Sequence, residues 1–201
     1  MDLVPAYPTV VGTLSPAEAQ MFSGDFRCER EDILPRQRLI TTDDILLFDR
    51  HTEPEGIILP EAYSQFLPVV HRAVTHEKTV RGNRQLRRVT VSVRQFVIQP
   101  GQSQLGDLGN EVHRDGEELD FFYNVSDTHP TQYYPHMAST PDTPNRIKLT
   151  DEKIRQGIAF GPFDIVWASS RMYHRAVPVT VATRRTSFRV AFNYSLPTSL
   201  R

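Results

Sequence analysis

The chain has 201 residues, 39% of them hydrophobic, and its 23 Lys+Arg against 24 Asp+Glu give a formal net charge of -1. This length and composition favour one globular domain, and the balanced, scattered charge argues against binding to nucleic acid. No stretch approaches the roughly 18 apolar residues of a membrane span. The N-terminus also lacks the pattern of a secretory signal, so a cytoplasmic location without a membrane partner is expected.

Cysteine usage limits the kind of metal site that the chain can build. Cys28 is the single cysteine of the sequence. A disulfide within the chain, a thiolate zinc site and an iron–sulfur cluster all need several cysteines, so none of them is expected. Any bound metal must be held by histidine and carboxylate side chains.

Two short helices are expected in the first third of the chain. The segment Ser15–Glu18 reads Ser-Pro-Ala-Glu, which is a capping box with proline at the first helical position, and a helix to about Phe22 follows. From Pro60, apolar residues recur at helical spacing and predict an amphipathic helix to roughly His76, bent at Pro68.

After Arg87 the hydrophobic period changes to two. Val89, Val91 and Val93 alternate with polar residues, and a phase slip before Phe96 suggests a β-bulge. Turn-rich segments separate the runs that follow, which is typical of an antiparallel barrel or sandwich. The further predicted strands are Leu119–Val125, Arg146–Leu149, Ile158–Phe160, Asp164–Ala168, His174–Val179 and Ser187–Ser195.

Three residues form a candidate metal site. Side chains two apart in a strand point to the same face, so His113 and Asp115 can offer an imidazole and a carboxylate to one ion. His174 opens a later strand that an antiparallel fold could place beside the first. Two histidines and one carboxylate leave three positions open on the metal, which suits iron(II) that binds a co-substrate and oxygen.

A candidate anion-binding pair follows the third ligand. Arg185 and Ser187 share one face of the last predicted strand and offer a planar fork and a hydroxyl, which suits a carboxylate near the metal. Arg189 lies on the same face and competes with Arg185, and Arg184 competes if the strand is displaced by one residue. We favour Arg185 because of its Ser187 partner.

Taken together, these motifs resemble the iron(II)- and 2-oxoglutarate-dependent oxygenases, whose fold is a double-stranded β-helix. The matching pieces span about residues 94 to 195, and their order and spacing are more specific than any one of them. They are Pro100-Gly101, His113-Arg114-Asp115, Gly161-Pro162-Phe163-Asp164-Ile165-Val166-Trp167, His174-Arg175-Ala176-Val177-Pro178-Val179 and Arg185-Thr186-Ser187.

The resemblance implies a fold and a domain plan. The fold would be mainly β, a double-stranded β-helix of the jelly-roll or cupin-like kind, with the N-terminal helices packed on the outside. The 201 residues would form a single oxygenase domain, with 1–84 as a helical and loop part and 85–201 as the β-helix core.

The resemblance also implies roles for individual residues. His113, Asp115 and His174 would bind Fe(II), and Arg185 and Ser187 would hold the distal carboxylate of 2-oxoglutarate, to which Tyr123 could also donate. Oxygen would oxidise 2-oxoglutarate to succinate and carbon dioxide while a substrate carbon is hydroxylated. Desaturation and ring closure remain open. Halogenation is disfavoured, because related halogenases have a small residue at the position of Asp115, which leaves an extra vacancy on the metal.

Two other functions stay open at this point. One is a cupin-type iron oxygenase or isomerase that does not use 2-oxoglutarate, and the other is a non-catalytic β-barrel that binds a ligand. The compact chain favours a small-molecule substrate such as an amino acid or a natural-product intermediate, and no motif indicates an oligomeric state. Four arginines hint at an anionic substrate: Arg94, Arg114, Arg171 and Arg175.

Overall fold

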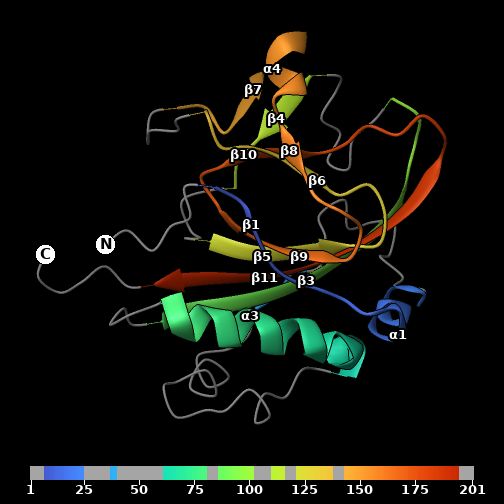
Figure 1. The fold of residues 1–201 in the computed structure, drawn as a ribbon, viewed down its shortest axis with the longest axis vertical. Coiled ribbons are helices and arrows are strands. Elements are labelled where there is room, and N and C mark those ends of the chain that lie inside the picture. Colours follow the sequence, from blue (N-terminus) through green and yellow to red (C-terminus); the bar gives the residue numbers. More distant parts are fainter. Residues whose placement is uncertain are drawn as a thin grey trace, which may run out of the picture.

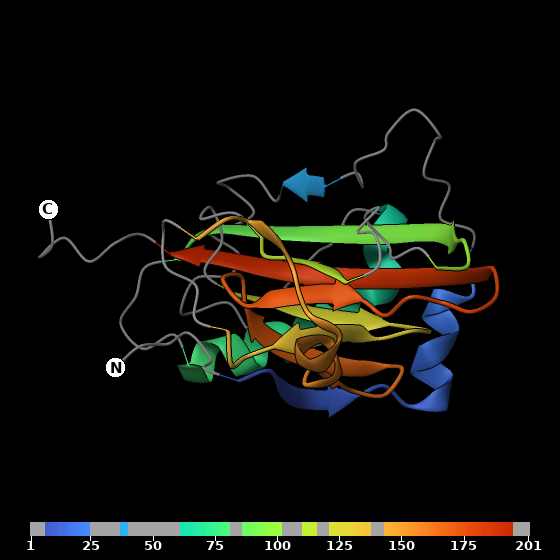
Figure 2. The same ribbon diagram turned by 90° about the horizontal axis from the view of Figure 1, so that it is seen from above.

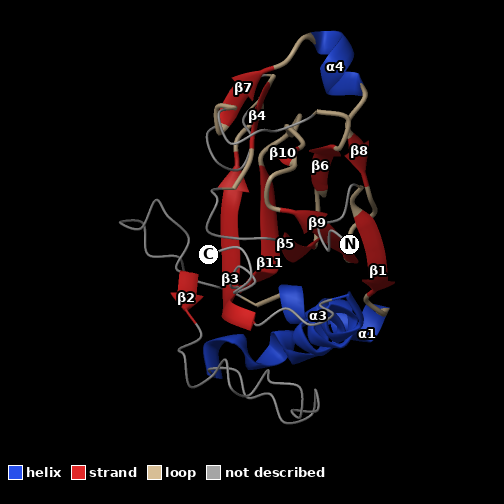
Figure 3. Ribbon diagram, turned by 90° about the vertical axis from the view of Figure 1, so that its left-hand side faces the viewer, coloured by secondary structure: helices blue, strands red, loops and turns tan. Residues whose placement is uncertain are grey.

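A computed structural model of the chain describes residues 7–24, 37–39, 61–80, 86–101, 110–115, 121–137 and 143–194. In these parts two antiparallel sheets face each other, as Figures 1 and 3 show. The larger sheet has the order β1 (Thr9–Thr13), β9 (Asp164–Ser169), β5 (Phe121–Ser126), β11 (Thr183–Tyr194), β3 (Leu86–Ile98) and β2 (Gln37–Leu39). The smaller sheet has the order β7 (Arg146–Lys148), β4 (Glu111–His113), β10 (Tyr173–Ala176), β6 (Thr131–Tyr134) and β8 (Ile158–Ala159).

The strand order is that of a jelly roll. The central strands of the large sheet run β9-β5-β11-β3, those of the small sheet run β4-β10-β6-β8, and the chain passes repeatedly from one sheet to the other. Two sheets of four strands connected in this way make a double-stranded β-helix. The mainly β fold predicted from the sequence is therefore confirmed.

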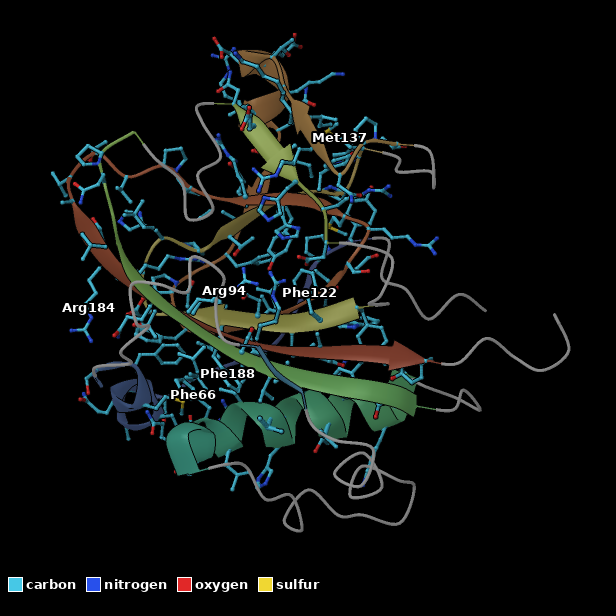
Figure 4. The ribbon with its side chains drawn as sticks, turned by 180° about the vertical axis from the view of Figure 1, so that it is seen from behind. Phe66, Arg94, Phe122, Met137, Arg184 and Phe188 are labelled. Carbon is cyan, nitrogen blue, oxygen red and sulfur yellow. The ribbon has the colours of Figure 1, made fainter. Side chains whose placement is uncertain are left out.

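The hydrophobic core lies between the large sheet and a helix on its outer face. After a 3-10 turn, η3 (Glu61–Phe66), the helix α3 (Leu67–Val80) runs along the sheet (Figures 1 and 2). Phe66 stacks on Phe188 of β11 with ring centroids 4.3 Å apart. Figure 4 shows this pair between the sheet and α3. The expected packing of N-terminal helices on the outside of the β-helix is confirmed.

The capping box at Ser15 is present. The Ser15 hydroxyl accepts from the backbone N–H of Glu18 at 3.3 Å, and the Glu18 carboxylate accepts from the backbone N–H of Ser15 at 2.8 Å. The helix α1 (Pro16–Ala19) then continues as the 3-10 turn η1 (Gln20–Phe22). The two bonds satisfy N–H groups that have no partner inside the helix.

Replacing this cap is expected to destabilise the fold. Ser15→Ala should lower the free energy of unfolding by about 1 kcal/mol, because an N–H of the first turn loses its acceptor. Ser15→Asp keeps an acceptor oxygen and serves as the control. Denaturant unfolding of the two variants measures the difference, and equal stability of both would show that the cap contributes nothing.

Several local predictions differ from the structure. The edge strand β1 lies in a region expected to be helix and loop, and β6 and the short helix α4 (Asp151–Arg155) were not predicted. The prediction of a bulge before Phe96 is wrong, since β3 pairs with β11 in unbroken register from Ile98 to Arg88. Pro68 does not bend a long helix, because the residues before Leu67 form the 3-10 turn and the α-helix starts there.

None of the helices in the described part of the chain is long and apolar enough to cross a membrane.

Candidate metal site and adjoining pocket

The three candidate ligands converge between the two sheets. His113 ends β4 and is the register partner of His174 on β10, so strand pairing brings residues far apart in the sequence side by side. One ligand atom from each of His113, Asp115 and His174 lies within 4.8 Å of the other two. Both histidines are buried, which keeps their imidazoles in fixed positions.

The segment after His113 holds Asp115 in place. The backbone N–H of Asp115 donates to the carbonyl of Ser170 at 3.1 Å, which ties it to the turn before β10. Between the two ligands, Arg114 turns away from the site and donates to the Asn145 side chain at 3.0 Å and to the Thr143 carbonyl at 2.6 Å. These bonds fix the loop and leave the two ligand side chains on the same side.

The surroundings of His174 keep its imidazole neutral and leave Nε2 free to bind a metal. Its Nδ1–H donates to the carbonyl of Met172 at 2.9 Å, which leaves the lone pair on Nε2. Nε2 is buried without a hydrogen-bond partner and lies 3.7 Å from Oδ2 of Asp115. Burial and the neighbouring His113 lower the pKa of His174 to about 3. An orphaned acceptor of this kind, beside an imidazole and a carboxylate, fits a metal ion.

Asp115 is ionised. Burial alone would raise its pKa, but Arg189 and the two histidines oppose this and lower the pKa to about 2. Arg189 on β11 donates from Nη1 to Oδ2 of Asp115 at 2.8 Å and lies over the ring of Phe122, 4.2 Å from its centroid. The carboxylate therefore has one cationic partner on the protein side.

Next to the candidate ligands is a pocket between the sheets. It is polar and cationic, because three of its lining side chains are arginines and the others are mostly hydroxyl, amide and imidazole groups. The lining residues are Ser92 and Arg94 of β3, His113 of β4, Asn124 of β5, Thr131 of β6, His174 and Ala176 of β10, and Arg185, Ser187 and Arg189 of β11.

Arg185 lies fully inside this pocket, only 1% exposed. Its Nε donates to the carbonyl of Thr128 and its Nη2 to the hydroxyl of Thr131, both at 3.2 Å. Burial lowers the pKa of Arg185 to about 10, so it stays charged at neutral pH. Ser187, two residues further along β11, is also buried and lines the pocket.

The other arginines considered from the sequence divide into two groups. Arg94 lines the pocket, and Arg189 reaches Asp115. Arg184 lies on the opposite face of β11, where its side chain is exposed and donates to the carbonyl of Gly24. Figure 4 shows Arg94 on the side facing the small sheet and Arg184 at the margin of the molecule. Arg114, Arg171 and Arg175 do not line the pocket.

The expectation that Tyr123 lies at the co-substrate site is wrong. Tyr123 faces α3, where its hydroxyl and Nδ1 of His76 are 2.9 Å apart, and it belongs to the core beneath the helix. Its neighbour Asn124 faces the pocket instead and donates to the hydroxyl of Thr131 at 3.2 Å. The signal was available in the sequence, because Phe122, Asn124 and Ser126, which directly follows the predicted strand, form the more polar face of this segment.

Comparison with known proteins gives structural similarities only. No family model matches the sequence, and no curated protein matches it either. An oxidoreductase of the 2OG-Fe(II) oxygenase family from Burkholderia pseudomallei is 12% identical with a TM-score of 0.39, over 67% of this chain and 59% of that one, so the chain spans about three fifths of that protein.

Two further solved structures align along most of the chain. AviO1 from Streptomyces viridochromogenes Tue57 is 15% identical, with a TM-score of 0.43, and the match covers 94% of this chain and 91% of that one. A viral collagen prolyl hydroxylase from Paramecium Bursaria Chlorella virus-1 is 11% identical, with a TM-score of 0.44, and the match covers 95% of this chain and 90% of that one. These similarities are distant, so the function is inferred below from the residues of this chain.

Proposed function

We propose that the chain is an iron(II)- and 2-oxoglutarate-dependent oxygenase that hydroxylates an unactivated carbon of a small molecule. The observation that carries the proposal is the convergence of His113, Asp115 and His174, with the buried, unpartnered Nε2 of His174 among them. Iron(II) held by two histidines and one carboxylate would couple oxidation of 2-oxoglutarate by oxygen, to succinate and carbon dioxide, with hydroxylation of the substrate.

The protein's own part in this chemistry is to bind and orient. The bond from His174 to the Met172 carbonyl fixes the ring and its tautomer. Arg189 holds Asp115 ionised and in position. Arg185 offers a buried cation that can grip the far carboxylate of 2-oxoglutarate in a fork, and Ser187 adds a hydroxyl beside it. Asp115 as a carboxylate favours hydroxylation over halogenation.

The proposal is tested by adding iron(II) and 2-oxoglutarate to the metal-free protein without oxygen. The chelate of 2-oxoglutarate on iron should give a weak visible charge-transfer band that saturates with 2-oxoglutarate. Admitting oxygen should then produce succinate. A protein that binds iron but shows no band and makes no succinate would instead be an iron protein that does not use 2-oxoglutarate.

The position of Tyr123 leads to a separate prediction. Tyr123→Phe should lower the free energy of unfolding by about 1 kcal/mol, because the buried hydroxyl loses its contact with His76. The same variant should bind 2-oxoglutarate with unchanged affinity, since the side chain faces α3. Asn124→Ala, altered at the next residue on the opposite face, is the counterpart and should weaken 2-oxoglutarate binding. Weakened binding in Tyr123→Phe would place Tyr123 at the pocket after all.

A further inference from the structure

The pocket holds one arginine more than the proposed co-substrate and metal site use. Arg185 would take the distal carboxylate of 2-oxoglutarate, while the other carboxylate and the keto oxygen would go to the metal. Arg189 is already paired with Asp115 at 2.8 Å. Arg94 remains. Its side chain lines the pocket, and its Nε is buried without a hydrogen-bond partner among the described residues.

The position of Arg94 close to two other arginines is energetically unfavourable without an anion. Arg94 lies within β3, and its register partner on β11 is Ser187, a small residue that lines the same pocket. Burial and the nearby Arg189 and Arg185 lower the pKa of Arg94 to about 10 and outweigh the opposing effect of Asp115, so the side chain remains charged. Holding a partly buried cation next to two others raises the free energy of the pocket unless an anion joins them.

Pairing with Asp115 does not account for Arg94, because Arg189 makes that ion pair at 2.8 Å. Arg185 has a negative charge of its own nearby, that of Asp127. With a divalent metal and dianionic 2-oxoglutarate in place, the pocket would still carry excess positive charge.

We infer that Arg94 receives a second anion, a carboxylate of the substrate that is hydroxylated. The Arg94 side chain is only partly exposed, so its open side can be reached by a ligand. The guanidinium fork suits a carboxylate in a bidentate arrangement. A substrate held there would have its carboxylate near β3 and its reacting carbon toward His113 and His174, which line the same pocket. This inference rests on the proposed function, because it takes 2-oxoglutarate to occupy Arg185.

The test measures whether small carboxylates bind to the protein that already holds iron(II) and 2-oxoglutarate. Anaerobic protein with iron(II) and saturating 2-oxoglutarate is titrated with acetate and with phenylacetate, and with acetamide and phenylacetamide as neutral counterparts of the same shape. We expect at least one acid to perturb the visible band saturably without competing with 2-oxoglutarate, and neither amide to do so. Arg94→Gln should weaken this binding by about tenfold or more.

The control variant is Arg184→Gln, which removes the same charge from the exposed face of β11 and should bind the acid like the wild type. Arg94→Gln should lose less 2-oxoglutarate affinity than Arg185→Gln. The inference is overturned if neither acid binds, if the amides bind equally well, if binding survives in Arg94→Gln, or if Arg94→Gln loses 2-oxoglutarate as severely as Arg185→Gln. Failure of the proposed function can be distinguished from failure of this inference, because the visible band would then be missing before any acid is added.

Discussion

Replacing His174 by alanine is expected to abolish the visible band of the anaerobic iron(II) and 2-oxoglutarate complex and to stop succinate formation. The imidazole Nε2 is the buried, unpartnered atom of the candidate site, and its removal leaves one histidine and one carboxylate. Loss of a partner outside the ligand set already weakens metal binding 10–100-fold, so loss of a ligand should cost at least about 100-fold. Titration with iron(II) under anaerobic conditions measures this affinity.

A histidine outside the site provides the control for this variant. His136 is exposed and lies edge-on to Tyr7, with ring centroids 5.6 Å apart. His136→Ala should keep both the band and the iron affinity of the wild type. Circular dichroism of His174→Ala establishes that the fold persists. If His174→Ala bound iron(II) and 2-oxoglutarate normally, the metal would lie elsewhere and the proposed function would be wrong.

Replacing Arg185 by glutamine is expected to weaken binding of 2-oxoglutarate while iron(II) still binds. Arg185 is charged, buried and fixed by bonds to Thr128 and Thr131, so it cannot move away and another side chain cannot easily take its place. Truncating one partner of a buried charge pair costs about 2–5 kcal/mol. That corresponds to an affinity about 30-fold lower or more, measured by titration of the visible band.

The neighbouring arginine allows a matched comparison. Arg184→Gln removes the same charge one residue earlier on β11, on the exposed face, and should leave 2-oxoglutarate affinity nearly unchanged. Arg185→Lys keeps the charge but not the fork and should fall between wild type and Arg185→Gln. A wild-type affinity in Arg185→Gln, together with a loss in Arg189→Gln, would move the anchor to Arg189.

The parts of the site that the sequence predicted are those fixed by local geometry. The alternation after Arg185 places Ser187 on the pocket side of β11. Asp115 is close to His113 as its spacing predicts, although β4 ends at His113 and the bond to Ser170 holds Asp115 in the loop that follows. His174 is different, because its position depends on the pairing of β10 with β4. Only the order of several motifs along the chain indicated that pairing in advance.

The errors come from hydrophobic patterns that were misread. Tyr123 was assigned to the pocket although it lies on the more apolar face of its strand, and that face packs against α3. Similarly, apolar residues change sides along β3 without a bulge: Val93 faces α3, whereas Ile98 is buried on the other face. A shift in the alternation of apolar and polar residues can therefore mean that the buried face of the strand changes, and it does not require the extra residue of a β-bulge.

The strand β1 supplies no residue to the pocket, yet it covers the outer backbone edge of β9 along Thr9 to Thr13. Arg72 of α3 donates to the carbonyl of Thr13 and pairs with Glu18 at 2.6 Å, which secures β1 and α1 against the helix. An uncovered edge presents free N–H and C=O groups that readily pair with another chain. β1 therefore pairs the outer backbone groups of β9 and itself forms the short edge of the large sheet, which Arg72 ties to the helix α3.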